Sequence, residues 1–465
     1  MCVCVGSLKS DYFKKIENEV NKIKIIDTHE HLQKEENRLK FEVDPLQLFL
    51  GQYISSDLIS SGMPIEDFSI VVNNQISMKD RWEKLSQYWD NVQNTGYAQA
   101  LHIAVKDIYG VDGLEKNTIT ELAKKMKQLN KRGLYKAILK DKAGIEIALH
   151  DTILKAKDYD YWNIKPITKT LDMDRSLFAP VHRFQDFLCI TERTDLDSLS
   201  RRLNHSIHSL EDLVKVFRTE FKNLSSQIYA VKIWLAYRRS IFFEKTTYAE
   251  AEKTFNEIYK QNSFKRIDIS GTRLTFPEGI SFKEAKPLQD FMVHEMIKLA
   301  IKHKLPLQIH TGIHEGNENI INNSNPTNLT NLFLEYKEAK FDIFHAGYPF
   351  LEETAAIVKN FQNVYVDLCW LHILSPSTAR RVLYEWLDTL PVNKILGFGG
   401  DYTFIEGSYG HSVIARRNII RVLQRKIDDG IVTLDEAVKI AKRLLRENAI
   451  ELFFQEKPLH SSRLD

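Results

Sequence analysis

Short apolar runs alternate with amphipathic stretches along most of the chain. The runs have the length and the β-branched content of buried strands, and the stretches between them have helical periodicity. We expect strands at residues 23–31, 145–150, 177–182, 229–235, 306–310, 341–345, 364–368 and 395–401. Strands separated by helices pair in parallel through right-handed crossovers. The pattern therefore predicts an α/β fold, a closed (β/α)8 TIM barrel.

One interval does not fit this alternation. Residues 33–144 separate the first two expected strands and are too long for a loop without structure of its own. Helical periodicity occurs in MKDRWEKLSQYWDNV, TGYAQALHIAVKDIYG and TITELAKKMKQLNKRGLYKAIL. Loops that follow barrel strands form the active-site face, so we expect a helical insertion that caps the site. A purely structural annex is the alternative, and in both cases residues 1–465 form a single domain.

Polar side chains that can bind metal stand where the expected strands end. His29 and His31 close the first strand, and their side chains point to the same face because strand residues alternate. Chance alone gives about 0.5 such pairs in a chain with 15 histidines, so this pair is weak by itself. Further candidates lie at or near the ends of the fourth, fifth, sixth and eighth strands: Lys232, His310, His345 and Asp401.

Each candidate has a structural alternative. A terminal histidine can bind a neighbouring loop, Asp401 can cap the next helix, and Lys232 can extend to solvent. Together, however, they gather at the face where barrel enzymes work. Imidazole and carboxylate ligands suit a divalent ion, with zinc favoured and one or two ions left open. Asp401 would bind the ion and move a proton, and the ion would activate water.

The order of these residues resembles the amidohydrolase superfamily. FHAGYP and ILGFGGDY resemble the sixth- and eighth-strand signatures of its amidohydrolase-related branch. The resemblance implies that the metal is bound by His29, His31, His310 and Asp401. It implies that His345 binds a second ion or contacts the substrate. Lys232 would be either a carboxylated bridge between two ions or a free ammonium group.

A second resemblance is narrower. The stretch TGYAQALHIAVKDIYGVDGLEKNTITELAKKM is similar to uronate isomerases, members of this superfamily that interconvert aldose and ketose sugar acids. In LFAPVHRFQDF, Arg183 matches an arginine that holds sugar-acid groups. The chain departs from these isomerases at residues 183–185, which read Arg-Phe-Gln instead of Arg-Pro-Asp, and at 401–403, which read Asp-Tyr-Thr instead of Asp-Ser-Arg. The architecture is therefore shared more clearly than the isomerase site.

Three further residues are candidates for substrate binding. Arg183 and Arg238 can hold a carboxylate through paired hydrogen bonds, although arginines are also common on surfaces. His314 follows the fifth strand in HTGIHEGN and either contacts the substrate or lies in a solvated loop. We therefore expect hydrolysis of a C–N or C–O bond in a small, polar, carboxylated substrate by metal-activated water. Uronate isomerisation, such as that of glucuronate, and a non-catalytic barrel scaffold are the alternatives.

Composition narrows the range of partners. Lysine and arginine number 64 against 62 acidic residues, so no basic excess indicates a nucleic-acid partner. The four cysteines form no disulfide framework, and no apolar run approaches the ~20 residues of a membrane span. We expect a cytoplasmic enzyme with a small-molecule substrate, no nucleic-acid partner and no membrane association. Assembly into a homo-oligomer is possible, and the sequence does not decide it.

Overall fold

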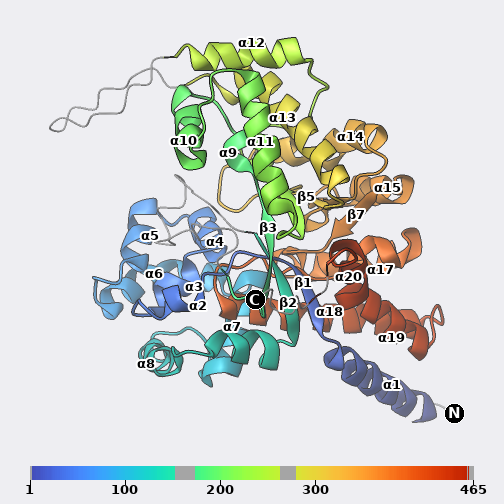
Figure 1. Cartoon of the computed structure of the whole chain (residues 1–465). Helices are drawn as coiled ribbons and strands as arrows, with labels where there is room; N and C mark the ends of the chain where they lie inside the picture. The colour runs from blue at the N-terminus through green and yellow to red at the C-terminus, as the bar shows by residue number, and fades with distance from the viewer. Residues whose placement is uncertain (1–2, 152–172, 262–278, 458, 460–465) are drawn as a thin grey trace.

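Eight parallel strands form one sheet in sequential order in the computed structural model, which describes residues 3–151, 173–261, 279–457 and 459 (Figure 1). The strands are β1 Ile25–Glu30, β2 Ile145–Asp151, β3 Phe178–His182, β4 Ala230–Ile233, β5 Leu307–Ile309, β6 Phe341–Ile343, β7 Val364–Asp367 and β8 Ile395–Leu396. Beyond β8, the Asp401 N–H donates to the His29 carbonyl at 2.8 Å. This brings the chain after β8 beside β1 and nearly closes the sheet. The predicted barrel is confirmed.

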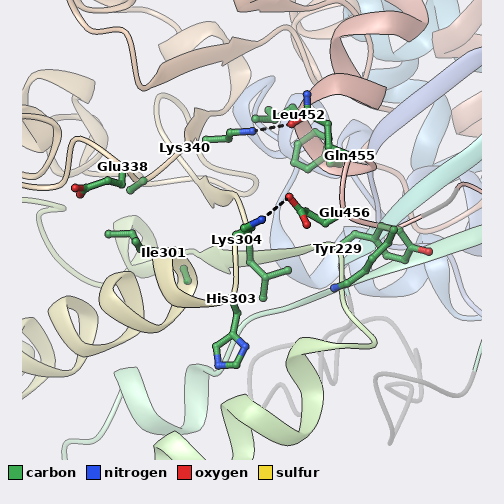
Figure 2. A pocket seen from close by; sticks show the side chains of 14 residues that line it. Tyr229, Ile301, His303, Lys304, Glu338, Lys340, Leu452, Gln455 and Glu456 are labelled. Carbon is green, nitrogen blue, oxygen red and sulfur yellow. Dashed lines mark hydrogen bonds and ion pairs between the residues drawn. The ribbon is translucent and has the colours of Figure 1, made fainter.

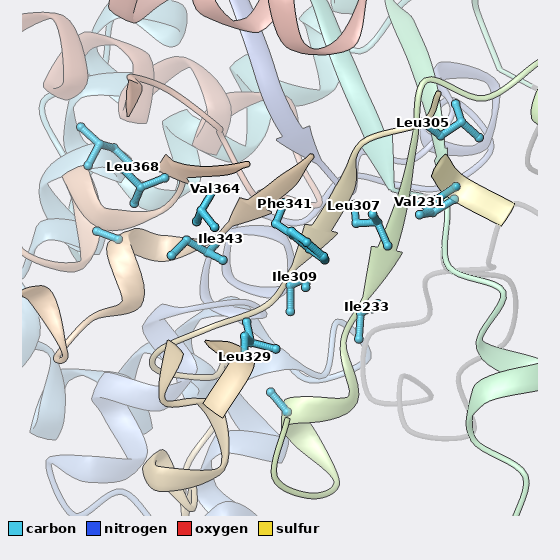
Figure 3. Close-up of a cluster of buried hydrophobic side chains, with 14 of the residues drawn as sticks. Val231, Ile233, Leu305, Leu307, Ile309, Leu329, Phe341, Ile343, Val364 and Leu368 are labelled. Atoms are coloured by element: carbon cyan, nitrogen blue, oxygen red, sulfur yellow. The ribbon is translucent and has the colours of Figure 1, made fainter. Parts of the chain in front are cut away.

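Strand register separates an apolar outer layer from a polar interior. Val231, Leu307, Phe341 and Val364 pair in register across β4–β7. They belong to the large apolar cluster of the molecule, part of which is drawn in Figure 3. Because successive strand residues face opposite sides, the next residue on each strand faces the other way.

These alternate positions carry polar side chains. Lys232, Gln308 and Asp342 pair in register on β4, β5 and β6, and all three are buried. Gln308 Nε2 donates to the Thr28 carbonyl on β1 at 3.1 Å, so this hydrogen bond crosses the barrel. The interior of the barrel is therefore polar at the level of Lys232, directly below the ends of the strands.

Helices surround the sheet. One precedes β1: α1 Val3–Lys22. Those between β3 and β5 are α9 Gln185–Leu188, α10 Arg193–Leu203, α11 Leu210–Ser225, η3 Leu235–Tyr237, α12 Tyr248–Tyr259 and α13 Phe282–Lys302. Those between β5 and β8 are η4 Ile321–Ser324, η5 Pro326–Leu329, α14 Thr330–Glu335, η6 His345–Gly347, α15 Leu351–Asn360, α16 Leu371–Leu374, α17 Pro376–Thr389 and η7 Val392–Lys394. Those after β8 are α18 Ile405–Asp428, α19 Leu434–Lys442, η8 Arg443–Glu447 and α20 Asn448–Phe453.

The chain between β1 and β2 is helical, and its helices lie together on one side of the barrel in Figure 1. They are α2 Glu35–Arg38, α3 Pro45–Leu50, α4 Ile54–Ser60, α5 Ile65–Val72, α6 Met78–Val92, α7 Gly96–Tyr109, α8 Ile119–Leu129 and η1 Lys136–Lys142. Their apolar side chains form a second cluster that also includes Trp370 and Tyr402. Arg38 anchors the segment to α18 through two bonds to the buried Glu406 carboxylate, of 2.9 and 2.6 Å. Its action as a cap stays a prediction.

No helix within the described ranges combines the length and the apolar character that a membrane span requires.

Candidate metal centre

The predicted ligands converge at the carboxyl-terminal end of the barrel. A cavity of about 390 Å³ is lined by His29, His31, Lys232, His310 and Asp401, among others. His345, which follows β6, lies directly behind this group, with Nε2 3.2 Å from His310 Nδ1. The structure therefore brings together every residue that the sequence proposed as a metal ligand.

Asp401 is the centre of the group. Its Oδ1 lies 3.2 Å from His29 Nε2 and 3.3 Å from His31 Nε2, and its Oδ2 lies 3.9 Å from His345 Nε2. The residue adopts a left-handed backbone conformation with φ of 59°, which is strained for a residue with a side chain. The side chains of Gln52, at 3.0 Å, and Tyr53 donate to its carbonyl and hold it there. Both donors come from the helical segment between β1 and β2.

A hydrogen bond to a backbone carbonyl determines which nitrogen of His31 carries the proton. His31 Nδ1 lies 3.1 Å from the Asp151 carbonyl, which can only accept, so Nδ1 carries the proton. In the neutral ring, Nε2 then presents a lone pair to Asp401 Oδ1. Burial raises the pKa of Asp401, but His29 and His31 outweigh burial and hold that pKa well below its usual range. A lone pair and an ionised carboxylate 3.3 Å apart repel each other unless a proton or a metal ion lies between them.

The same conflict recurs between His310 and His345. His345 Nδ1 faces the Cys369 carbonyl at 3.1 Å, and His310 Nε2 faces the Ile313 carbonyl at 3.1 Å. Both of these nitrogens must therefore donate, which leaves His345 Nε2 and His310 Nδ1 as acceptors 3.2 Å apart. Burial lowers the pKa of His345 to about 4 and that of His310 well below its usual range, so both rings are neutral at pH 7. Two facing lone pairs again require a cation.

This donor set fits a divalent ion. Zinc–ligand bonds of 2.0–2.2 Å in tetrahedral geometry place neighbouring ligand atoms about 3.3–3.6 Å apart. The spacings around Asp401 Oδ1 are close to that range. Among the described residues, two groups bring enough donor atoms within reach of one ion: His29, His31 and Asp401, and His345, Cys369 and Asp401. No pattern in the sequence marks Cys369 as a metal ligand, because it simply follows the apolar strand β7.

Lys232 is enclosed beside these ligands. Its side chain is 1% exposed, which excludes the alternative in which it extends to solvent. Its Nζ lies 3.2 Å from the centre of the Phe344 ring and has no hydrogen-bond partner among the residues that the structure describes. Burial lowers the pKa of Lys232 to about 8, against the opposing effect of Asp151 and Asp401. The lowered pKa increases the fraction of Lys232 that is neutral amine, the form that reacts with carbon dioxide.

The proposed substrate residues take different positions. Arg183 lines the cavity and is held by Asp151 through two bonds of 2.7 Å. Burial raises the pKa of Asp151, but the Arg183 guanidinium outweighs it and lowers that pKa. Arg238 is exposed and also lines the cavity. His314 lines a neighbouring cavity instead, and its ring centre lies 5.2 Å from that of His310.

Several cavity residues were not anticipated. Aromatic side chains form much of the wall: Tyr53, Trp234, Tyr237 and Trp370. Glu315 also lines it, and burial, with a smaller effect from Asp401, raises the pKa of Glu315 to about 8. Glu315 could have been predicted as a cavity residue, because it directly follows the candidate His314 in the sequence. Tyr53 could not have been predicted, since it reaches Asp401 only because a segment remote in the sequence packs there.

Another cavity, of about 240 Å³, lies at the opposite end of the barrel (Figure 2). Its lining includes Lys304 and Lys340, which precede β5 and β6. Lys304 Nζ lies 3.0 Å from the Glu456 carboxylate, and Lys340 Nζ lies 3.4 Å from Gln455 Oε1. Within the part of the chain that the structure describes, no metal-ligating group forms there. Lys304 and Lys340 at this end are therefore both paired.

Residues 270–455 match the family model described as Amidohydrolase. This part of the chain is therefore similar to that family. The amidohydrolase match contains His310, His345 and Asp401, whereas the β1 histidines lie outside it. The candidate ligand groups at the strand ends are of a kind that could hold a divalent ion.

Solved structures share the barrel fold across nearly the whole chain. A uronate isomerase from Thermotoga maritima has a TM-score of 0.71 at 14% identity, covering 96% of this chain and 97% of that one. A glucuronate isomerase from Caulobacter crescentus has a TM-score of 0.70 at 14% identity, covering 96% and 94%. A candidate metal-dependent hydrolase from Lactobacillus casei has a TM-score of 0.65 at 19% identity, covering 95% and 98%. These likenesses establish the fold.

A curated relative matches in sequence over a shorter range. Protein fluG from Emericella nidulans is 28% identical over 182 residues, which are 38% of this chain and 21% of that protein. The match thus spans about a fifth of the relative's length.

Proposed function

We propose that this protein is a metal-dependent hydrolase that cleaves a C–N or C–O bond in a small polar substrate carrying a carboxylate. The observation that carries the proposal is the convergence on Asp401 Oδ1, with His29 Nε2 at 3.2 Å and His31 Nε2 at 3.3 Å. The amidohydrolase match over residues 270–455 supports it. Zinc is the favoured ion, because all of these donors are imidazole nitrogens or carboxylate oxygens.

The residues that would hold the ion are His29, His31, His310 and Asp401. A second ion would take His345, with Lys232 as a carboxylated bridge. Burial and the missing hydrogen-bond partner of Lys232 Nζ favour such a bridge, because an unpaired ammonium group is costly inside a protein. When bound, a divalent ion lowers the pKa of water and polarises a carbonyl.

The chain's own residues would perform the remaining tasks. Asp401, ionised at pH 7, accepts the proton of the attacking water and returns it to the leaving group. Arg238 supplies a cation for the substrate carboxylate, and Asp151 orients Arg183 towards the same cavity. Trp234 and Trp370 narrow the cavity and exclude bulk water from the reacting bond. A non-catalytic scaffold would have no use for such converging acceptors.

Uronate isomerisation is the second candidate. Its support is the likeness to two uronate isomerases over 96% of this chain, which includes the helical segment between β1 and β2. On a single ion it needs no bridge, and Lys232 would then remain an amine that contacts the sugar acid. We place hydrolysis first because Tyr402 and Thr403 replace the serine and arginine expected in that family.

Activity assays separate the two candidates. Zinc-loaded protein is tested on N-acyl amino acids, dipeptides and lactones, and in parallel on glucuronate and galacturonate. We expect hydrolysis that is lost in Asp401→Asn and retained in Glu456→Gln, a matched carboxylate change at the opposite end of the barrel. Conversion of the uronates to ketoses without any hydrolysis would replace our first candidate with the second.

Lys232 gives a separate test of the number of ions. Bicarbonate should accelerate reconstitution of metal-free protein with zinc, and Lys232→Ala should bind one ion fewer than the wild type. Carbon-13 NMR with labelled bicarbonate should detect the carbamate. Full activity with an unmodified Lys232 and a single ion would contradict the bridged site.

A further inference from the structure

A second cavity, of about 660 Å³, borders the metal cavity and is named the outer cavity here. Glu315, Gly316 and Trp370 line both cavities and form their common wall. The outer cavity also reaches α4 and the beginnings of α7 and α17. A ligand bound at the metal can therefore have a neighbouring chamber for a further group.

Two arginines line the outer cavity without an ion-pair partner. Neither Arg380 on α17 nor Arg421 on α18 has a carboxylate within ion-pair distance in the residues that the structure describes. Arg380 Nη1 donates to Asn418 Oδ1 at 2.9 Å. Burial, and then the charge of Arg421, lowers the pKa of Arg380, which places the two cations near each other. Arg381, the next residue on α17, instead pairs with Glu352 and Glu385 at 3.3 and 3.0 Å.

Other features of the outer cavity also suit an anion. The 14-residue helices α7 and α17 both begin at its wall, with N-caps Thr95 and Ser375. Helix N-termini carry positive dipole ends and favour oxyanions. His314 lines the cavity and is 4% exposed, and its Nε2 has no hydrogen-bond partner among the described residues. Burial lowers the pKa of His314 to about 4, so the neutral ring would offer an anion a hydrogen bond and no charge.

One acidic side chain, Asp57, lines the outer cavity beyond the common wall. It makes no ion pair with either arginine in the described part of the chain, so it does not neutralise them. Burial raises the pKa of Asp57, and a hydrogen bond with the Thr95 side chain opposes this shift. The outer cavity therefore keeps its two unpaired cations beside the metal cavity.

We propose that the outer cavity binds a second anionic group of the substrate, a carboxylate or a phosphate, remote from the bond that is cleaved. This inference rests on the proposed hydrolase, because it assumes that the reacting bond lies at the metal. The substrate would then be an extended molecule with two anionic groups. Arg238 in the metal cavity and the Arg380–Arg421 pair in the outer cavity would hold one group each.

The anion site is tested first without metal. Inorganic phosphate is titrated calorimetrically into metal-free wild type, Arg380→Gln/Arg421→Gln and the matched control Arg381→Gln. We expect phosphate to bind the wild type and the control equally and the double variant at least tenfold more weakly. Failure of phosphate to bind the wild type, or equal binding to the double variant, would overturn the site. This experiment does not depend on the proposed reaction.

The link to the substrate is tested with the zinc-loaded protein. Linear dicarboxylates from succinate to suberate are compared with acetate, since a ligand that spans both cavities gains from its second contact. We expect one chain length to bind at least tenfold more tightly than acetate, and this gain to disappear in Arg380→Gln/Arg421→Gln. If phosphate binds but no dicarboxylate exceeds acetate, the outer cavity binds free anions and the substrate assignment is wrong. Retained phosphate binding without any hydrolysis would count against the proposed function alone.

Discussion

At the amino-terminal end of the barrel Lys304 lies 3.0 Å from Glu456, whereas at the carboxyl-terminal end Lys232 Nζ is buried and finds no hydrogen-bond partner in the described part of the chain. Both ends contain a cavity and both carry lysines. The difference is that Lys304 and Lys340 in Figure 2 have partners, while the carboxyl-terminal end holds facing acceptors such as His310 and His345. Buried polar groups without partners are rare in proteins unless a ligand satisfies them. The unsatisfied polar groups of this comparison thus lie at the carboxyl-terminal end, the face where barrel enzymes work.

The largest expected effect is the loss of activity at Asp401. Asp401→Asn keeps the shape of the side chain but removes its charge and its capacity to carry a proton. We expect kcat/KM for the hydrolysed substrate to fall by about 10²–10⁴-fold, the range for general acid–base groups. Steady-state kinetics measure this change, and circular dichroism should show an unaltered fold. A variant that keeps more than about a tenth of wild-type activity would remove Asp401 from the mechanism.

The next effect is on stability, at the ion pair that joins the helical segment to the barrel. Arg38 and Glu406 side chains are 6% and 0% exposed. Arg38→Met leaves the Glu406 carboxylate buried without its cation, which typically costs roughly 3–5 kcal/mol. Urea denaturation measures the loss, and Arg38→Met/Glu406→Gln should recover part of it. A loss below about 1 kcal/mol would mean that this contact does not anchor the segment.

A smaller effect concerns pH. Burial raises the pKa of Glu315 from 4.5 to about 8 in the folded protein. Between these values the folded state binds a proton that the unfolded state has lost, so Glu315 makes stability fall as pH rises from about 4.5 to 8. Glu315→Gln should flatten that decline in metal-free protein, as measured by urea denaturation at pH 5, 6.5 and 8. An unchanged slope in the variant would show that Glu315 is ionised throughout.

The smallest effect is expected at the amino-terminal end. Lys304 and Glu456 side chains are 69% and 55% exposed, and exposed pairs contribute about 0–1 kcal/mol. Lys304→Ala should change the free energy of unfolding by less than about 1 kcal/mol and leave metal content and kinetics unchanged. Loss of metal in Lys304→Ala would contradict the claim that only the carboxyl-terminal end takes part in metal binding.

The barrel could be predicted because each strand is a short apolar run that can be recognised from its own residues, without knowledge of distant ones. It also predicted that His29, His310 and Asp401 converge, since the carboxyl ends of parallel strands meet at one face. The expected strand at residues 395–401 was too long, and β8 ends at Leu396. A Cβ at Gly400 would lie 1.9 Å from Glu30 Oε1. After β8 the backbone therefore passes so close to the Glu30 side chain that only glycine fits.

Other features could not be read from local patterns. The Asp151 partner of Arg183, and the hold of Tyr53 on the Asp401 carbonyl, depend on packing between segments far apart in the sequence. Ring orientation is a further example, because the carbonyls that fix His31 and His345 belong to other strand ends. These contacts decide which nitrogen can bind a metal.

Metal content per chain, measured by mass spectrometry of purified protein, tests the central claim most directly. We predict at least one divalent ion per wild-type chain, mainly zinc, and loss of most of it in His29→Ala/His31→Ala. Lys304→Ala, the matched change at the opposite end, should keep the full content. Stoichiometric metal in the folded His29→Ala/His31→Ala protein would contradict the assignment of the carboxyl-terminal end as the metal centre.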